Sequence, residues 1–348
     1  MSCSEITRFD KTPGRFPARE LDLPMRYDAV ALGELLIDFT RVGADADGYP
    51  TMAAHPGGAP ANFLATMAKF GASTALLGQV GDDAFGQMLL ETLRRSHIDP
   101  TGIVVDPHAF TTLAFVTLDQ SGDRAFSFAR KPGADTRLSF EELDRSILDR
   151  TRVFHFGTLS LTDEPARTAT RQAVAYARGK GTLVSFDPNL RRMLWSDLAR
   201  AREEMLWGLT QADIVKLSEE EFSFLLGQMS YEEGTQYLLK EYDIKLLFLT
   251  LGASGCIFAS ASAFGRVGPL TGITPVDTTG AGDIFGGSAL WKLLQTGKAP
   301  QALCAAELEE IARFACTAAG LSTTRPGGLS SVPSLPAVLE QLEHIGAP

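Results

Sequence analysis

The chain has 348 residues, of which 45% are hydrophobic and 21% are charged, and its formal net charge is −10. A chain of this length and composition can bury a full hydrophobic core, which excludes a disordered protein. The negative net charge argues against a surface that neutralises nucleic-acid phosphates or anionic lipids, because such surfaces need clustered Lys and Arg. We therefore expect a small-molecule partner, and neither nucleic acid nor membrane.

The N-terminal segment, residues 1–25, mixes charged residues with prolines and has no continuous apolar core. It therefore lacks the hydrophobic region of a signal peptide, and we expect a flexible extension ahead of one domain formed by residues 26–348. No stretch of the chain reaches the roughly 18 to 20 uninterrupted apolar residues that a membrane helix needs. These features predict a cytoplasmic protein.

Short apolar runs alternate with helical patterns through most of the chain. Fully apolar strands of this length are those buried on both faces of a parallel sheet, and their alternation with helices is typical of β-α-β units. The fold class is therefore predicted to be α/β, a sandwich around a mainly parallel sheet. The predicted strands are 28–33, 73–78, 152–156, 182–186, 213–217 and 245–251, and the predicted helices include 61–70, 84–95, 165–178 and 219–226.

Two segments, about 36–54 and 111–130, break this rhythm with alternating polar and apolar residues. Such alternation is typical of antiparallel strands, and the turn at 119–123, which contains Gly122, favours a hairpin in the second segment. We expect a small antiparallel β lid that stands off the main body over a cleft. Ordinary edge strands are the alternative that this pattern also allows.

The most informative motif is the glycine-rich run Asp277-Thr278-Thr279-Gly280-Ala281-Gly282-Asp283, which precedes a helix-compatible apolar stretch at 284–294. A helix N-terminus presents unpaired backbone N–H groups, and the helix dipole adds positive potential there. Gly280 and Gly282 leave no side chain between these amides and a phosphate. Asp283 would repel a resting phosphate, but as a base it would accept the proton of a hydroxyl that attacks one. A helix-capping role for Asp283 is the alternative.

Other nucleotide-binding motifs do not fit the sequence. A Rossmann fingerprint would need Gly where Phe285 stands, and the Gly-Lys pairs at 179–180 and 297–298 continue with Gly181 and Ala299 rather than the Ser or Thr of a P-loop. Protein kinase signatures are missing too, since the chain contains no His-Arg-Asp. A nucleotide would therefore bind by another scheme.

The run that ends in Asp283 resembles the C-terminal signature of the ribokinase-like (PfkB) carbohydrate kinases. The segment Gly57-Gly58-Ala59-Pro60-Ala61-Asn62, together with Gly81-Asp82-Asp83, is similar to the family's other signature. The resemblance covers about residues 27–335 and implies a three-layer α/β/α sandwich that acts as an ATP-dependent sugar kinase. Blocks such as Asp187-Pro188-Asn189-Leu190-Arg191 are most similar to fructokinases, which implies conversion of D-fructose to fructose 6-phosphate as the leading reaction.

The same resemblance implies roles for the residues at the motif positions. Carboxylate and amide groups also suit a polyol on chemical grounds alone. Without the family, Asp38 would be interpreted as a turn residue and Asn62 as a helix cap. The implied positions are Asp38, Gly57, Gly58 and Asn62 for the sugar, and Asp283 with an anion hole of Gly280, Ala281 and Gly282 for catalysis.

The resemblance also implies ATP and Mg²⁺ as cofactors, and a monovalent cation, usually K⁺, that supports the anion hole. Ser218 stands where many relatives have Asn, a departure from the pattern, and Glu221 is expected to reach Mg²⁺ through water. Without the family, Glu221 would belong to the solvated first turn of a helix. The implied nucleotide positions are Lys216, Ser218, Glu221, Thr250, Gly252, Gly255, Gly280 and Gly282, and those of the monovalent cation are Asp277, Thr279, Ser322, Arg325, Gly327 and Ser331.

Arg130 follows the second lid segment and is expected to reach the cleft from the lid. A guanidinium there would pair with a substrate carboxylate, which keeps 2-keto-3-deoxygluconate kinase as an alternative, beside a ribokinase of the same family. A solvated arginine at the lid edge is the other interpretation of Arg130. A sugar-sensing protein without transfer activity is a different class of function, and the presence of Asp283 argues against it. The open edges of the lid strands suggest pairing with a second subunit, which would give a homodimer through the lid.

Overall fold

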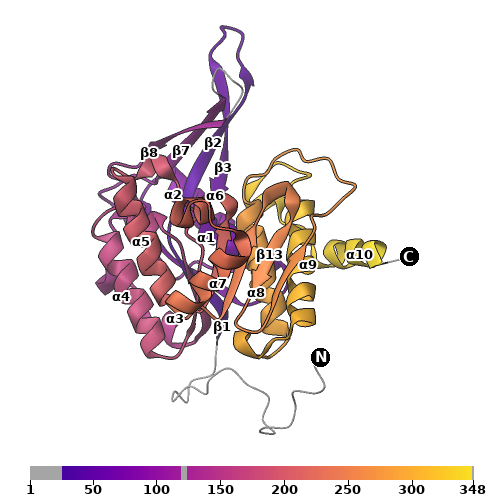
Figure 1. Cartoon of the computed structure of the whole chain (residues 1–348). Helices are drawn as coiled ribbons and strands as arrows, with labels where there is room; N and C mark the ends of the chain where they lie inside the picture. The colour runs from indigo at the N-terminus through magenta and orange to yellow at the C-terminus, as the bar shows by residue number, and fades with distance from the viewer. Residues whose placement is uncertain (1–25, 119–123, 347–348) are drawn as a thin grey trace.

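The computed structural model describes residues 26–118 and 124–346. Their strands form a ten-stranded central sheet in the order β14-β13-β12-β11-β10-β9-β1-β4-β5, with β6 also paired to β4. Figure 1 shows the whole chain, with helices packed around this sheet. The pairs from β12 to β5 are parallel, whereas β13 and β14 run antiparallel at one edge. The predicted mainly parallel sheet is therefore confirmed.

The predicted strands and helices are present, with ends shifted by at most three residues. The strands of the central sheet are β1 (Tyr27–Leu32), β4 (Thr74–Gly81), β5 (Ile98–Asp99), β6 (Ile103–Asp106), β9 (Thr151–Phe156), β10 (Leu183–Phe186), β11 (Ile214–Ser218), β12 (Leu246–Thr250), β13 (Cys256–Ala259) and β14 (Phe264–Val267). The α-helices are α1 (Ala59–Lys69), α2 (Ala84–Arg95), α3 (Arg145–Asp149), α4 (Ala166–Gly179), α5 (Leu198–Gln211), α6 (Glu219–Leu226), α7 (Tyr231–Tyr242), α8 (Ala281–Gln295), α9 (Ala305–Ser322) and α10 (Leu335–Gly346).

Successive residues of one strand serve two separate cores. In β1, Ala29 and Ala31 pack into the cluster that α1, α2, α8 and α9 cover, whereas Val30 and Leu32 pack into the cluster under α3 to α7. Side chains alternate across a strand, so a sheet covered by helices on both faces needs apolar residues at every position. The three-layer α/β/α sandwich follows from this and is confirmed. In the part of the chain that the structure describes, no helix combines the length and apolarity needed to cross a membrane.

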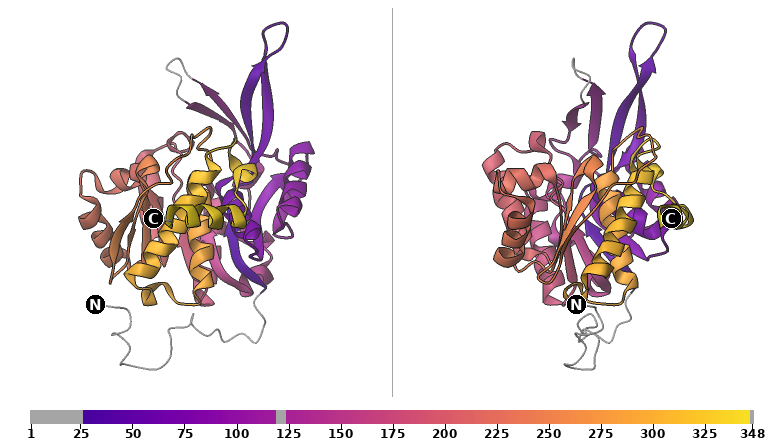
Figure 2. Two further views of the ribbon diagram at one scale, coloured as in Figure 1. Left: turned by 90° about the vertical axis from the view of Figure 1, so that its right-hand side faces the viewer. Right: turned by 45° about the vertical axis from the view of Figure 1, so that its right-hand side comes forward.

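A second, four-stranded sheet stands off the body, as Figure 2 shows. Its strands, in spatial order, are β3 (Pro50–Gly57), β2 (Leu36–Ala44), β7 (Leu113–Leu118) and β8 (Arg124–Ala129). The β2–β3 and β7–β8 pairs are antiparallel as predicted, but the two hairpins meet through a parallel β2–β7 pair, because both first strands leave the body in the same direction. The small, mainly antiparallel sheet is therefore confirmed, and its role as a lid stays a prediction. The predicted turn at 119–123 lies outside the described residues.

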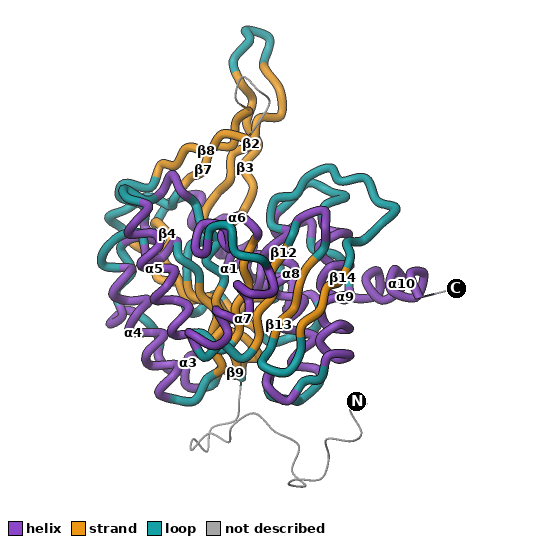
Figure 3. The backbone as a smooth tube through the Cα atoms, viewed as in Figure 1, coloured by secondary structure: helices purple, strands orange, loops and turns teal. Residues whose placement is uncertain are grey.

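A long loop, residues 268–280, joins β14 to α8 without a helix or strand of its own (Figure 3). It ends at the glycine-rich run, so the N-terminus of α8 lies next to a segment that no sheet pairing holds. Asp277 links this loop to the one that follows α9, since its two carboxylate oxygens accept the N–H groups of Thr279 and Gly327, both at 2.9 Å. The two loops therefore support the start of α8 together.

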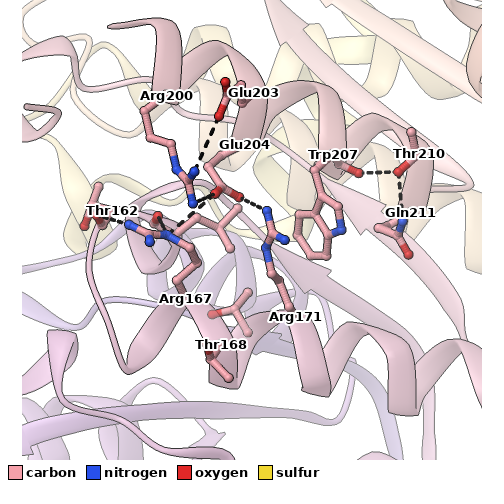
Figure 4. A network of polar contacts seen from close by, with 12 residues as sticks. Thr162, Arg167, Thr168, Arg171, Arg200, Glu203, Glu204, Trp207, Thr210 and Gln211 are labelled. Atoms are coloured by element: carbon pink, nitrogen blue, oxygen red, sulfur yellow. Dashed lines mark hydrogen bonds and ion pairs between the residues drawn. The ribbon is translucent and has the colours of Figure 1, made fainter. Parts of the chain in front are cut away.

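The helices α4 and α5 are joined by a carboxylate that is buried among three arginines (Figure 4). The Glu204 side chain is 0% exposed, and its oxygens lie 2.7 Å from Arg171, 3.0 Å from Arg200 and 3.5 Å from Arg167. Arg167 also donates to the carbonyl oxygens of Leu161 and Thr162, at 2.8 and 2.7 Å. The network therefore ties both helices to the segment after β9.

Substituting Glu204→Gln should lower the free energy of unfolding by about 1–3 kcal/mol, because it leaves three arginine charges without their shared carboxylate. The loss stays below that of a wholly buried pair, since Arg171 and Arg200 reach solvent with side chains 41% and 44% exposed. Urea denaturation measures the change. The neighbouring Glu203→Gln, at a side chain that is 67% exposed, serves as the control and should alter stability by less than about 0.5 kcal/mol. Equal effects of the two variants would contradict this account.

Candidate active site

The carboxyl ends of the parallel strands open into a pocket of about 290 Å³. Ligands bind α/β sheets in crevices at this edge. β1 leads into Glu34 and β10 into Asn189, while the lid strand β2 contributes Asp38. The lining residues are Glu34, Leu36, Asp38, Gly58, Ala59, Asn62, Phe128, Leu159, Asn189, Arg191, Lys216, Thr278, Thr279, Gly280, Gly282 and Asp283.

The glycine-rich turn forms one wall of this pocket and begins α8. Gly280 is the N-cap, with a left-handed φ of 79° that favours glycine. The N–H of Ala281 is bonded to the carbonyl of Thr278, whereas those of Gly282 and Asp283 have no partner among the described residues. Two free amides at a helix N-terminus are suited to bind an anion, and the anion hole at this turn stays a prediction.

Asp283 lies in the first turn of α8 and is only 9% exposed. Its Oδ2 accepts a 2.8 Å hydrogen bond from Nδ2 of Asn62, which α1 presents from the other side of the cleft. A Cβ on Gly280 would lie 3.2 Å from the same Asn62 nitrogen, so a bulkier residue would crowd this contact. Asn62 therefore orients the carboxylate that was predicted to act as the base.

The predicted sugar residues converge on the same wall. A Cβ on Gly57 would lie 2.1 Å from Oδ2 of Asp38, so only glycine at position 57 leaves the Asp38 carboxylate in place. Gly58 has a φ of 120°, and a Cβ there would lie 2.4 Å from the carbonyl oxygen of Glu34. The two glycines thus shape the floor between the lid and α1, where Asn62 also lies.

Burial shifts Asp283 and Asp38, two of the three carboxylates that line the pocket, toward their protonated forms. Burial raises the pKa of Asp283, while the Asn62 hydrogen bond and the charges of Lys216 and Arg191 oppose this rise. Burial also raises the pKa of Asp38, to about 6, with Arg191 opposing and Asp283 adding to the shift. Both groups ionise as the pH rises through their raised pKa values, so chemistry that needs the carboxylates weakens as the pH falls.

A second, mostly apolar pocket of about 500 Å³ adjoins the first. Thr278 and Gly282 line both pockets, so the two cavities meet at the glycine-rich turn. Among the predicted nucleotide residues, Thr250, Gly252 and Gly255 lie in its lining, and the other lining residues are Ala253, Pro269, Leu270, Ile273, Pro275, Ala281, Phe285, Cys316, Ala319, Gly320 and Thr323.

Glu221 and Ser218 form the start of α6. They make a capping box, in which Ser218 Oγ accepts the N–H of Glu221 and Glu221 Oε2 accepts the N–H of Ser218, at 3.2 and 2.7 Å. Oε1 of Glu221 accepts the N–H of Leu190 at 2.8 Å, which fixes the loop that carries Asn189 and Arg191. Each carboxylate oxygen of Glu221 keeps a lone pair, which can accept a further hydrogen bond from a water molecule.

The predicted cation residues lie at the end of α9 and on the two loops that support α8. Besides the Asp277 contacts, the N–H of Gly328 donates to the carbonyl oxygen of Thr279 at 3.2 Å, and Ser331 Oγ donates to that of Gly328 at 2.8 Å. Arg325 N–H bonds to the carbonyl of Ser322 at 3.4 Å. Among the residues described, no group of three or more His, Cys, Asp or Glu side chains is arranged to hold a metal ion.

Arg130 does not line the pocket, contrary to the prediction. Its side chain is 3% exposed, and its guanidinium pairs with Asp135 at 2.7 Å and donates to Thr162 and to the carbonyl of Leu159. Its charge is therefore used inside the fold, and the observation that favoured a carboxylate substrate is lost. Arg191, Asn189 and Glu34 line the pocket instead. Their positions just after β10 and β1, at the carboxyl edge of the sheet, were the available signal.

The sequence of the chain is similar to that of known carbohydrate kinases. Residues 27–335 match the model of the pfkB family carbohydrate kinases. The chain belongs to this family. Over 316 residues it is 41% identical to fructokinase-1 of Zea mays, covering 90% of the chain and 97% of that protein.

Solved structures of the family have the same fold. A fructokinase from Xylella fastidiosa with bound ATP has a TM-score of 0.83 and 30% identity, over 92% of this chain and 100% of that one. A double mutant of the Vibrio cholerae fructokinase, with fructose, ADP and a potassium ion bound, has a TM-score of 0.79 and 31% identity, over 92% and 100% of the two chains. These matches show that the protein is a carbohydrate kinase and therefore a sugar phosphotransferase.

Substituting Asn62→Ala removes the hydrogen bond that favours ionised Asp283, so it should raise the pKa of Asp283. The acid limb of the pH profile of kcat/KM should then move to higher pH, with about a tenfold loss of kcat/KM on the acid side of the profile. Thr66→Val, which removes a buried hydroxyl one helical turn along α1, should leave the limb in place. A limb unchanged in Asn62→Ala would show that this contact does not tune the base.

Proposed function

We propose that this chain is an ATP-dependent fructokinase that transfers the γ-phosphoryl group of ATP to the 6-hydroxyl of D-fructose. The observation that carries the proposal is that a polar pocket and a larger apolar pocket meet at Gly282, beside Asp283. A sugar in the first pocket and a nucleotide in the second would place hydroxyl and phosphate on opposite sides of one turn. The names of the similar proteins support fructose as the sugar.

The residues of the polar pocket suit the acceptor. Asp38 and Asn62 would bind sugar hydroxyls, with Gly57 and Gly58 giving the ring close access to the backbone. The acceptor oxygen attacks the γ-phosphorus while the bond from that phosphorus to the bridging oxygen of ADP breaks, and the hydroxyl proton passes to Asp283. The free amides of Gly282 and Asp283 stabilise the charge on the transferring group.

The residues proposed to bind the metal cofactors offer mainly oxygen atoms as ligands. Mg²⁺ on the ATP phosphates would contact Glu221 through water, which suits the lone pairs that the capping box leaves. A potassium ion would be held by Asp277, Thr279, Ser322, Arg325, Gly327 and Ser331, largely through backbone oxygens, and would add positive charge behind the anion hole. Turnover that is unchanged when potassium is omitted would count against this second ion.

The lid segments 36–54 and 111–130 would close over the sugar, because they carry the pocket residues Asp38 and Phe128. A closed lid keeps water from the phosphoryl group, and slower hydrogen exchange of both segments upon adding fructose would report it. The open lid edges would also allow pairing with a second copy of the chain, which sedimentation would detect.

Asp283→Asn should lower turnover by about 10²- to 10⁴-fold, because the acceptor hydroxyl loses its base. The assay is ATP consumption with fructose, ribose, tagatose, 2-keto-3-deoxygluconate and adenosine, and fructose should give the highest kcat/KM. The control is Asp243→Asn, at an exposed carboxylate far from the pocket in a left-handed turn that Asn tolerates. Full activity of Asp283→Asn would refute the mechanism. No turnover of any sugar by the unaltered protein would favour a sensor.

A further inference from the structure

Asp187 is a buried carboxylate to which the reaction proposed above gives no role. It follows β10 at the carboxyl edge of the sheet and is 6% exposed. Its two oxygens lie 3.0 and 3.3 Å from the ammonium of Lys216, and Oδ1 also accepts the N–H of Asn189 at 3.2 Å. Asp187 therefore holds a single cation in a defined place.

That place is beside the glycine-rich turn. A Cβ built on Gly282 would lie 3.1 Å from Nζ of Lys216, the nearest atom it would meet. The ammonium thus approaches the backbone of α8 at the residue whose amide is free and which lines both pockets. Charge that develops on a transferring phosphoryl group would lie within its reach.

Lys216 has several carboxylates within its electrostatic reach. Asp283 is one of these carboxylates, and the polar and charged groups around it come from five parts of the fold. These groups are Asn62 of α1, Lys216 of β11, Arg191 of the loop after β10, Glu221 of α6 and Asp38 of the lid. The charges of Asp187, Glu221 and Asp283 hold the pKa of Lys216 above its usual value despite burial. Among the described residues, however, Lys216 makes an ion pair with Asp187 and none with Asp283.

We propose that Asp187 is a positioning residue for phosphoryl transfer, which holds the Lys216 ammonium against Gly282 and keeps it from closing onto Asp283. The inference rests on the proposed kinase function. An ammonium paired directly with Asp283 would stabilise the carboxylate and weaken it as a base. Held by Asp187, the same charge serves the phosphoryl group while Asp283 remains free to accept the proton.

The two partners have opposite effects on Asp283, which makes the inference testable. Asp187→Asn removes a negative charge and releases Lys216 toward Asp283, so the pKa of Asp283 falls and the acid limb of the kcat profile moves to lower pH. Lys216→Met removes the positive charge, so that limb moves to higher pH. Loss of either charge moves this limb through electrostatics alone, so the positioning role is decided by kcat on the pH-independent plateau, which a merely structural pair would leave unchanged.

The experiment measures kcat, KM for fructose and the pH profile of each variant with saturating MgATP. In Asp187→Asn we expect kcat to fall by about 10- to 100-fold and KM to change by less than about threefold, since the loss lies in the transition state. The matched control is Asp213→Asn, at a carboxylate near the opposite end of β11 that bonds the N–H of Val184, and it should leave the acid limb in place.

Each outcome decides the inference. A kcat of Asp187→Asn within twofold of the unaltered protein, or limbs that move in the same direction in both variants, would overturn it. If a single variant fails to fold in a thermal melt, the double variant Asp187→Asn with Lys216→Met buries no unpaired charge, and restored kcat in it would overturn the role of Lys216. Loss of turnover in Asp283→Asn beside normal Asp187→Asn would reject this inference alone, whereas absence of fructose phosphorylation by the unaltered protein would reject the proposed function.

Discussion

The bare helix N-terminus at Gly280 to Asp283 is the constraint on which the rest of the site depends. Its free amides can bind an anion only if no side chain covers them. Gly280 and Gly282 each meet a different steric requirement. Gly280 takes the left-handed conformation and leaves room for Asn62, whereas Gly282 leaves room for the ammonium of Lys216. A side chain at either position would displace a polar partner of the turn as well as block a phosphate.

The turn also explains why distant parts of the chain must meet. The lid strand β2 brings Asp38, α1 brings Asn62, and β11 brings Lys216 to the same wall. Buried carboxylates at such a site repel one another and are shifted toward their protonated forms, and nearby hydrogen-bond donors and cations oppose this shift. Asn62, Lys216 and Arg191 supply these, which is why the loops and strands that carry them are as much part of the site as Asp283.

Much of this could be predicted from the sequence, because local patterns determine it. Apolar runs such as residues 246–249 occur where a sheet is buried on both faces, and two glycines before a carboxylate at a helix start indicate an anion site. What depends on pairing between distant segments could not. Arg130 is charged and borders the lid, yet its buried pairing with Asp135 takes it out of the pocket. The parallel β2–β7 pair depends on how two hairpins leave the body, and the place of Arg191 depends on the hydrogen bond from Leu190 to Glu221. The periodicity of polar and apolar residues in the sequence does not predict such contacts.

The most direct test of the account is a crystal structure of the protein with fructose and a non-hydrolysable ATP analogue. The account predicts a sugar hydroxyl within hydrogen-bond distance of the Asp283 carboxylate and the terminal phosphate on the amides of Gly282 and Asp283. A sugar bound with every hydroxyl away from Asp283, or a nucleotide whose terminal phosphate avoids the glycine-rich turn, would contradict it.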